Sequence, residues 1–202
     1  MDRAARRLQG SYGAYPATSR ILVSLRIAAV PERAFEVFVC EIGVWWRPNA
    51  LFRFRSPPAG VVAFEPGLDG RLTETSADGE VFEIGRITVW EPGVRLAFTW
   101  RQASFAPGQS TEVEARFEPV GNETRVTVEH RGWETIPQEH VARHTFPDAI
   151  FLQRRGEWWQ RLLGFYAARV ADSAKSRPVR TAGDRGTPTC RGRPHRQRRR
   201  VL

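Results

Sequence analysis

Three ionisable residues fall where the surrounding pattern predicts an inward-facing position. His130 is in phase with the apolar residues of one predicted strand, and Glu74 is in phase with those of another. Arg155 projects from the apolar stripe of a predicted helix. An isolated charge is very costly to bury. We therefore expect Arg155 to meet Glu74 or His130 inside the protein and to fix the polar end of a ligand there.

A second interpretation of the same residues stays open. Glu74 and His130 could lie at strand ends near water, with Arg155 in a frayed first turn of its helix. The pKa of His130 separates the two arrangements. A value far from about 6.5 would indicate the interior one, and an ordinary titration the exposed one.

Other motifs for catalysis or metal binding are weak. No nucleophile motif, phosphate-binding loop or cysteine-based metal spacing occurs in the sequence. His140 and His144 are four residues apart and follow Glu139, so on a helix they could face one metal. A third ligand at useful spacing is not evident. We expect surface histidines in a connecting segment, and we predict no metal, no cofactor and no catalytic residue.

The helix that carries Arg155 is predicted over residues 147–170. At 3.6 residues per turn its apolar side chains form one broad face, and polar side chains form the opposite one. The apolar face comprises Phe151, Trp158, Trp159, Leu162, Leu163, Phe165 and Tyr166. Because Arg155 interrupts this face, either the regular helix starts near Gly156 or a cation points into the interior.

The chain before this helix is predicted to form mostly short strands. A strand at residues 21–28 precedes a helix that begins at Pro31 and stops near Gly43. Further strands are predicted at residues 61–65, 71–75, 81–90, 95–101, 111–118 and 124–131. A change of phase in the strand at 81–90 predicts a β-bulge at Gly85, which would help the sheet to curve.

These elements predict a curved antiparallel sheet covered by the final helix. Each strand has one apolar and one polar face, which suits a sheet that is wetted on one side. A space between such a sheet and the helix would favour a small apolar ligand. Its lining residues are predicted to include Trp100 and one of Trp158 and Trp159, while most other aromatic side chains, Trp45 and Trp46 included, are expected to be core. The full candidate ligand-binding set is Trp46, Glu74, Phe98, Trp100, His130, Arg155, Trp158 and Trp159.

The net charge of +9 belongs to the two ends of the chain. Residues 171–202 hold ten Lys or Arg against two Asp, and residues 1–20 hold four Arg against one Asp. Residues 21–170 are therefore slightly acidic, which argues against a basic nucleic-acid face on the folded part. We predict disordered segments at 1–20 and 171–202 around one domain at 21–170. Nucleic acid would bind only non-specifically, through the Arg-rich tail.

Membrane and secretory signals are lacking in the sequence. No apolar run is long enough to span a membrane, and the first residues lack the apolar core of a secretory signal. With only two cysteines, a disulfide scaffold is not expected. The sequence therefore favours a reduced, cytoplasmic setting.

Several strings in order along residues 21–170 resemble one known superfamily. They are Pro31-Glu32-Arg33-Ala34-Phe35 with Trp45-Trp46, Phe64-Glu65-Pro66 with Gly70-Arg71, Gly85-Arg86-Ile87 with Trp90-Glu91-Pro92, Arg95-Leu96-Ala97-Phe98-Thr99-Trp100, Phe117-Glu118-Pro119, Thr124-Arg125-Val126-Thr127-Val128-Glu129-His130 with Gly132-Trp133, and Gly156 with Trp158-Trp159. They resemble the SRPBCC (START-like, Bet v 1-like) superfamily. Within it, they are most similar to the bacterial group named after the activator of the heat-shock-protein-90 ATPase.

The resemblance implies an α+β helix-grip fold, a curved antiparallel sheet around a long C-terminal helix. It does not imply one activity, because members include lipid and sterol carriers, polyketide cyclases, sequestering resistance proteins and co-chaperone domains. We expect a domain that binds a small hydrophobic molecule, with no assignable reaction. The first alternative is a stress-related, co-chaperone-like module that binds a protein partner. The second is a cyclase or dehydratase that uses His130 with Glu74 or Arg155 for acid–base work.

Overall fold

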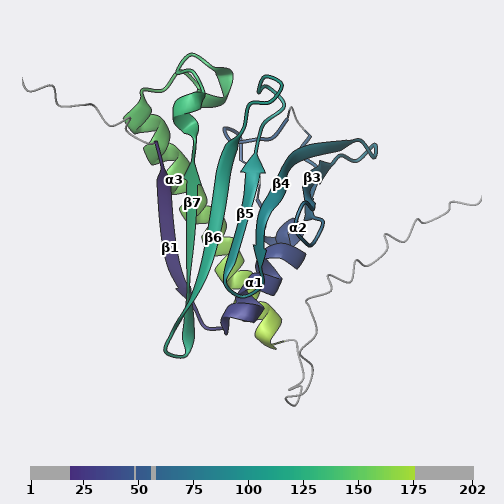
Figure 1. Ribbon diagram of the computed structural model, residues 1–202, viewed down its shortest axis with the longest axis vertical. Helices are drawn as coiled ribbons and strands as arrows, with labels where there is room; N and C mark the ends of the chain where they lie inside the picture. The colour runs from purple at the N-terminus through teal and green to yellow at the C-terminus, as the bar shows by residue number, and fades with distance from the viewer. Residues whose placement is uncertain (1–18, 48, 56–57, 176–202) are drawn as a thin grey trace, which may run out of the picture.

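A computed structural model describes residues 19–47, 49–55 and 58–175 of the chain (Figure 1). The elements are β1 (Ile21–Ile27), α1 (Pro31–Cys40), α2 (Ile42–Trp45), β2 (Val61–Phe64), β3 (Arg71–Thr75), β4 (Val81–Glu91), β5 (Arg95–Trp100), β6 (Thr111–Val120), β7 (Glu123–Arg131), two short 3-10 turns at Trp133–Thr135 and Val141–Arg143, and α3 (Asp148–Lys175). Each predicted strand is confirmed, with ends that differ by at most two residues.

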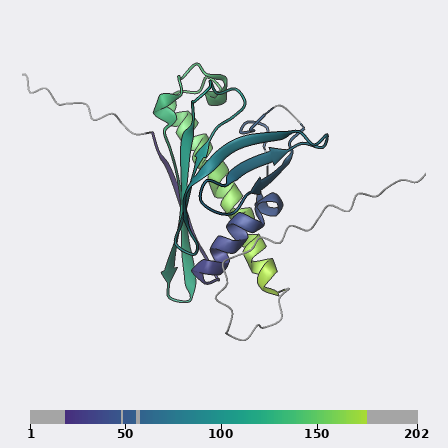
Figure 2. The ribbon, with the colours of Figure 1, turned by 45° about the vertical axis from the view of Figure 1, so that its right-hand side comes forward.

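The seven strands form one antiparallel sheet in the order β1-β7-β6-β5-β4-β3-β2. Strands β2 to β7 pair with their neighbours in the chain, as short turns require. β1 crosses over to pair with β7, and this places Ile21 opposite His130. α3 lies across the inner face of the sheet (Figures 1 and 2). The predicted helix-grip architecture is therefore confirmed.

The sheet bends at the β-bulge that the sequence predicts. Leu72 pairs with Gly85 while Thr73 pairs with Glu83, so Ile84 is an extra residue in β4. A Cβ atom at Gly85 would lie 1.7 Å from the carbonyl oxygen of Thr99, so only glycine allows this close approach. The ladder between β4 and β5 shifts again after Ile87. As a result, β2 to β4 turn away from the plane of β1, β6 and β7 and curl around α3 (Figure 2).

α3 starts at Asp148 and carries its buried face against the sheet. The question left open by Arg155 is answered, because the helix is already regular there and the side chain is 0% exposed. The prediction for Phe165 is wrong: it lies at the edge of the apolar stripe, next to buried Tyr166, and is 42% exposed. The helix also continues past residue 170 to Lys175. The remainder of both predicted tails, residues 1–18 and 176–202, lies outside the described residues.

The first helix stops earlier than expected. α1 ends at Cys40, because Glu41 leaves the helical region with φ −116° and ψ 16°. Gly43 is therefore not the stop but lies inside the short helix α2. The tryptophans that follow are core, as expected: Trp45 and Trp46 are 1% and 7% exposed. The indole of Trp45 donates to the carbonyl of Phe38 at 3.2 Å, which ties α2 to α1.

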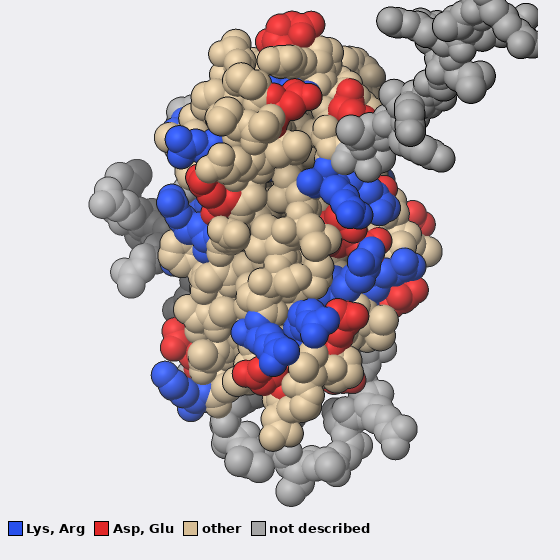
Figure 3. Space-filling view, turned by 90° about the vertical axis from the view of Figure 1, so that its left-hand side faces the viewer, with Lys and Arg blue, Asp and Glu red and all other residues tan. Residues whose placement is uncertain are grey.

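One face of the domain mixes charges of both signs. On the face shown in Figure 3, Lys and Arg side chains alternate with Asp and Glu, so this face carries no extended patch of one sign. None of the described helices has the length and hydropathy needed to cross a membrane.

Candidate functional site

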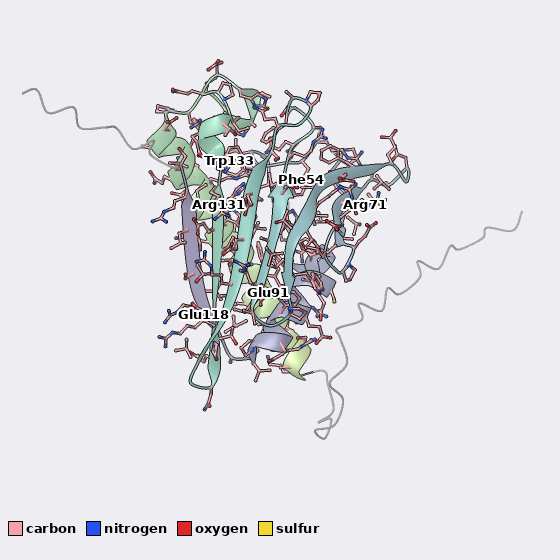
Figure 4. All side chains as sticks on the ribbon, viewed as in Figure 1. Phe54, Arg71, Glu91, Glu118, Arg131 and Trp133 are labelled. Carbon is pink, nitrogen blue, oxygen red and sulfur yellow. The ribbon has the colours of Figure 1, made fainter. Side chains whose placement is uncertain are left out.

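Arg155 lies inside a cage of four aromatic rings. Its guanidinium carbon is 4.5 Å from the ring centre of Trp158, 4.6 Å from that of Phe52, 4.7 Å from that of Trp133 and 5.1 Å from that of Trp100. The rings come from α3, the loop before β2, the turn after β7 and the end of β5. We call these four rings and Arg155 the arginine cage. It lies at the end of the sheet where Figure 4 labels Trp133 and Phe54, away from Glu91 and Glu118.

The cage holds a positive charge without a counter-charge. Within the described chain, none of the three guanidinium nitrogens of Arg155 has a hydrogen-bond partner. The indole N–H groups of Trp100, Trp133 and Trp158 also lack an acceptor there. Burial lowers the pKa of Arg155 well below its ordinary value, but a guanidinium keeps its proton at neutral pH. The cage therefore gathers unused hydrogen-bond donors around one buried cation.

Aromatic faces reduce the cost of this arrangement without removing it. Each desolvated cation–π contact contributes up to about 2 kcal/mol, so the four contacts together offset much of the several kcal/mol that burying an ion costs. Ring faces also accept no conventional hydrogen bond from the edge of the guanidinium, where its N–H groups lie. An acceptor that enters the cage would satisfy donors that the protein leaves unused.

His130 lies beside the cage and is held in one tautomer. The indole N–H of Trp159 donates to His130 Nδ1 at 3.2 Å, so the proton of the neutral ring is on Nε2. His130 Nε2 is 2.8 Å from Thr111 Oγ1, which accepts a hydrogen bond from its N–H and in turn donates to the carbonyl of Trp100 at 3.3 Å. Both ring nitrogens are used within the protein. His130 therefore has no lone pair free to act as a base on a ligand in this arrangement.

The pKa of His130 is lowered well below 6.5, first by burial and then by the charge of Arg155. The side chain is 0% exposed, which contradicts the interpretation of a strand end near water. Its neighbours from β6, α3, β5 and the turn after β7 are Thr111, Trp159, Trp100 and Trp133, none of them ionised at neutral pH. The ring is thus kept neutral by its surroundings.

This depressed pKa predicts a loss of stability in acid. The unfolded chain binds a proton at His130 below about pH 6.5, whereas the folded chain does not, so stability falls as the pH falls. Between about pH 7.5 and about pH 5.5, His130 should contribute a loss of about 1.4 kcal/mol. The measurement is the free energy of urea unfolding at both pH values. His130→Gln keeps one acceptor and one donor, and between the two pH values its free energy of unfolding should fall by about 1.4 kcal/mol less than that of the unmodified protein. Equal losses in both proteins would contradict a buried, neutral His130.

The predicted pairing of Arg155 with Glu74 is not found. The carboxylate of Glu74 accepts from Arg55 Nε at 3.2 Å and from the backbone N–H of Gly60 at 2.9 Å. It is 3% exposed but belongs to the β2–β3 edge of the sheet. Strand phase indicated correctly that Glu74 is buried. It could not show that Arg55, in an irregular loop, is the partner.

The other candidate residues divide between the cage and the core around it. Trp100 and Trp158 belong to the cage. Trp46 and Trp159 form a second layer, with ring centres 5.9 Å apart. Phe98 packs against Phe64, with ring centres 5.2 Å apart. The structure therefore buries both helix tryptophans and gives them different contacts, a choice that the sequence left open: Trp158 contacts Arg155, and the indole of Trp159 donates to His130.

Sequence reasoning missed several residues of the site. Phe52 lies in a stretch without periodicity, so no pattern pointed to it. Trp133 follows Gly132, whose φ of 91° starts the turn after β7. Gly132-Trp133 was noted in the sequence only as part of the resemblance. His144 contacts the ring of Phe52 at 5.7 Å between centres, and burial lowers its pKa.

His140 and His144 do not act as a metal-binding pair in this structure. His140 Nε2 is 3.0 Å from the carbonyl of Ser104, and its Nδ1 accepts from the backbone N–H of Ala142. The segment is a 3-10 turn rather than a helix, and His144 takes a left-handed conformation after it. Among residues 19–47, 49–55 and 58–175, no group of three potential ligands is close enough to hold a metal ion.

Among the surface pockets of the described residues, two border side chains of this site. The larger, of about 480 Å³, is lined by residues at the ends of β5, β6 and β7, including Thr111 and the ion-paired Glu112 and Arg131. The smaller, of about 160 Å³, is lined by Arg47, Asn49, Trp158, Arg161, Leu162 and Phe165. We call the smaller one the Trp158 pocket, because this residue lines it and also contacts Arg155 on the cage side.

Comparison with known proteins identifies the family. Residues 28–150 match the model of the family described as activator of Hsp90 ATPase homolog 1-like protein. The chain belongs to this family. It is accordingly a member of the SRPBCC superfamily, as the sequence strings indicated. The match ends shortly after α3 begins, so Arg155, Trp158 and Trp159 lie beyond the matched residues.

Solved structures related to this activator-homologue chain share its fold. MLL2253 from Mesorhizobium loti has a TM-score of 0.53 and 17% identity, with 76% of this chain and 97% of that chain covered. NE0264 from Nitrosomonas europaea has a TM-score of 0.51 and 11% identity, with coverage of 78% and 97%. DynU16, a putative protein of the dynemicin biosynthetic locus, has a TM-score of 0.52 and 17% identity, with coverage of 77% and 48%. No match is found among curated proteins.

Proposed function

We propose that this domain binds a small, largely aromatic molecule between the inner face of the sheet and α3, at the arginine cage. The observation that supports this most directly is the set of unused donors there: three guanidinium nitrogens and three indole N–H groups without an acceptor. Native proteins rarely leave buried polar groups unpaired. A guest that carries acceptor atoms would pair them, and the aromatic walls would cover its apolar part.

The geometry favours binding over acid–base catalysis. Both ring nitrogens of His130 are engaged by Trp159 and Thr111, and Glu74 is engaged by Arg55 and Gly60. His130, which the cyclase or dehydratase alternative requires, and Glu74, one of its two possible partners, are therefore committed to structural bonds. We propose a carrier or sequestering role for a small hydrophobic molecule, in the cytoplasm.

The test is a thermal-unfolding screen with tryptophan fluorescence as a second signal. The probes are a naphthalene and an anthracene derivative, a fatty acid, and a purified Hsp90-type chaperone. A guest at about 100 times its Kd should stabilise the fold by about 2.7 kcal/mol. It should also change the emission of the cage tryptophans. A response to the chaperone alone would favour the protein-interaction role, and no response to any aromatic probe would contradict our proposal.

A further inference from the structure

We propose that the guest is an aromatic carboxylate whose anionic group pairs with Arg155, and that it enters past Trp158. This inference rests on the proposed function, because it specifies the chemistry of the guest at the same site. It follows from the charge balance of the cage, from the shape of the guanidinium and from the pocket outside it.

The charge balance calls for an anion. The groups nearest to Arg155 are uncharged aromatic rings and two histidines, His130 and His144, whose pKa values are both lowered in part by the charge of Arg155. Within the described chain, no Asp or Glu forms an ion pair with Arg155. Lone buried ions are several kcal/mol unfavourable, and an opposite charge from a ligand offsets this cost.

The donor geometry favours a carboxylate. A guanidinium presents its N–H groups in a planar fork that matches the two oxygens of a carboxylate, and such pairs form two parallel hydrogen bonds. The indole N–H groups of Trp100, Trp133 and Trp158 are additional donors of the same cage. Its walls are four aromatic rings, and a stacked or edge-to-face contact with a further ring contributes about 0.5–1.5 kcal/mol beyond the area that it buries. A carboxylate on an aromatic ring meets both requirements.

The Trp158 pocket provides the entrance. Its volume of about 160 Å³ is close to that of an apolar cavity that holds one benzene ring. Trp158 lines this pocket, and its ring centre lies 4.5 Å from the guanidinium carbon of Arg155. The indole N–H of Trp158 has no partner within the described chain, so the ring is held by packing against Trp46, Phe52 and Trp159 and not by a hydrogen bond. Rotation of this one side chain would join the pocket to the cage.

The charges at the entrance agree with an anionic guest. Arg47 and Arg161 are exposed and line the pocket. The described residues that line it include no Asp or Glu. Positive charge at the mouth of a pocket raises the local concentration of anions and their association rate, most strongly at low salt. The entrance and the cage thus select for the same sign of charge.

The decisive experiment compares two probes of equal shape, 2-naphthoate and the neutral 2-naphthamide. Calorimetric titration at neutral pH should show that naphthoate binds about tenfold or more tightly. Arg155→Met should abolish this preference by weakening naphthoate alone. Equal affinities in the unmodified protein would overturn the inference and leave the proposed function standing, because an aromatic guest still binds. Failure of both probes, and of the aromatic probes in the unfolding screen, would overturn both.

The entrance is tested by association rates in stopped-flow fluorescence. The double variant Arg47→Gln with Arg161→Gln should slow the association of naphthoate several-fold at low salt, and added salt should reduce the difference. Arg154→Gln is the matched control, because Arg154 is an exposed cation of the same helix outside the pocket. A control that slows association as much as the double variant would contradict entry past Trp158.

Discussion

Replacing Arg155 by methionine should make the ligand-free protein more stable, by about 1–4 kcal/mol in the free energy of unfolding. The guanidinium is fully buried and has no hydrogen-bond partner within the described chain, so its removal leaves no group behind unsatisfied. Methionine has a similar length, and its sulfur makes favourable contacts with aromatic rings. Urea unfolding of the two proteins without ligand measures the difference.

Arg143 supplies the matched control for this substitution. It is also buried and also lies over an aromatic ring, that of Phe151 at 5.0 Å. In contrast to Arg155, it donates to the carbonyls of Trp133 and Ile136 at 3.2 and 2.9 Å and pairs with Asp148. Arg143→Met should therefore destabilise the fold by about 1–3 kcal/mol, because two carbonyls lose their donor.

Our interpretation of the cage requires that Arg155→Met and Arg143→Met change the free energy of unfolding in opposite directions. If Arg155→Met destabilises the protein as Arg143→Met does, the cage stabilises its cation by itself and the argument for a guest loses its basis. If Arg155→Met instead stabilises the protein, the Arg155 side chain lowers the stability of the ligand-free fold. Residues that cost stability are typical of functional sites rather than of cores.

Trp159→Ala should destabilise the domain by about 3–5 kcal/mol, the usual effect of removing a large aromatic side chain from a core. Trp159 is 0% exposed, and its ring lies 5.3 Å from that of Trp158 and 5.9 Å from that of Trp46. The change also removes the donor to His130 Nδ1. The measurement is the midpoint and free energy of urea unfolding at neutral pH.

Phe165→Ala is the control for Trp159→Ala. Phe165 lies on the same helix but is 42% exposed, so its removal should change the free energy of unfolding by no more than about 0.5 kcal/mol. A large loss for both variants would indicate that α3 tolerates no truncation of either face. A small loss for both would contradict the role of α3 as the cover of the sheet.

Much of the fold could be predicted from the sequence because its signals are local. Alternation of apolar residues located all seven strands, and the phase change at Gly85 located the bulge. The spacing of apolar residues from Phe151 to Tyr166 located α3. The end of α1 was wrong by a few residues, since Glu41 leaves the helix without a glycine or a proline to mark the place.

The sequence predicted only those site residues that lie in strands or helices with a periodic apolar pattern. Phase alone directed His130, Glu74 and Arg155 inward, and all three are buried. The partners of these groups depend on chain segments far apart in sequence. Arg55, which pairs with Glu74, and Phe52, which borders Arg155, both come from an irregular loop. No periodic pattern exists there, so the contacts become visible only once the strands are assembled.

The crossover of β1 to β7 has a consequence for how the chain assembles. Ser24 and Thr127 share a hydrogen bond across 103 residues of sequence. During synthesis β1 emerges first, but it has no partner strand until almost the whole sheet has left the ribosome. Contacts of such long range slow folding, and an unpaired strand is prone to association with other chains. The slow step of folding should therefore be the joining of the first strand to the last, with α3 docking across it.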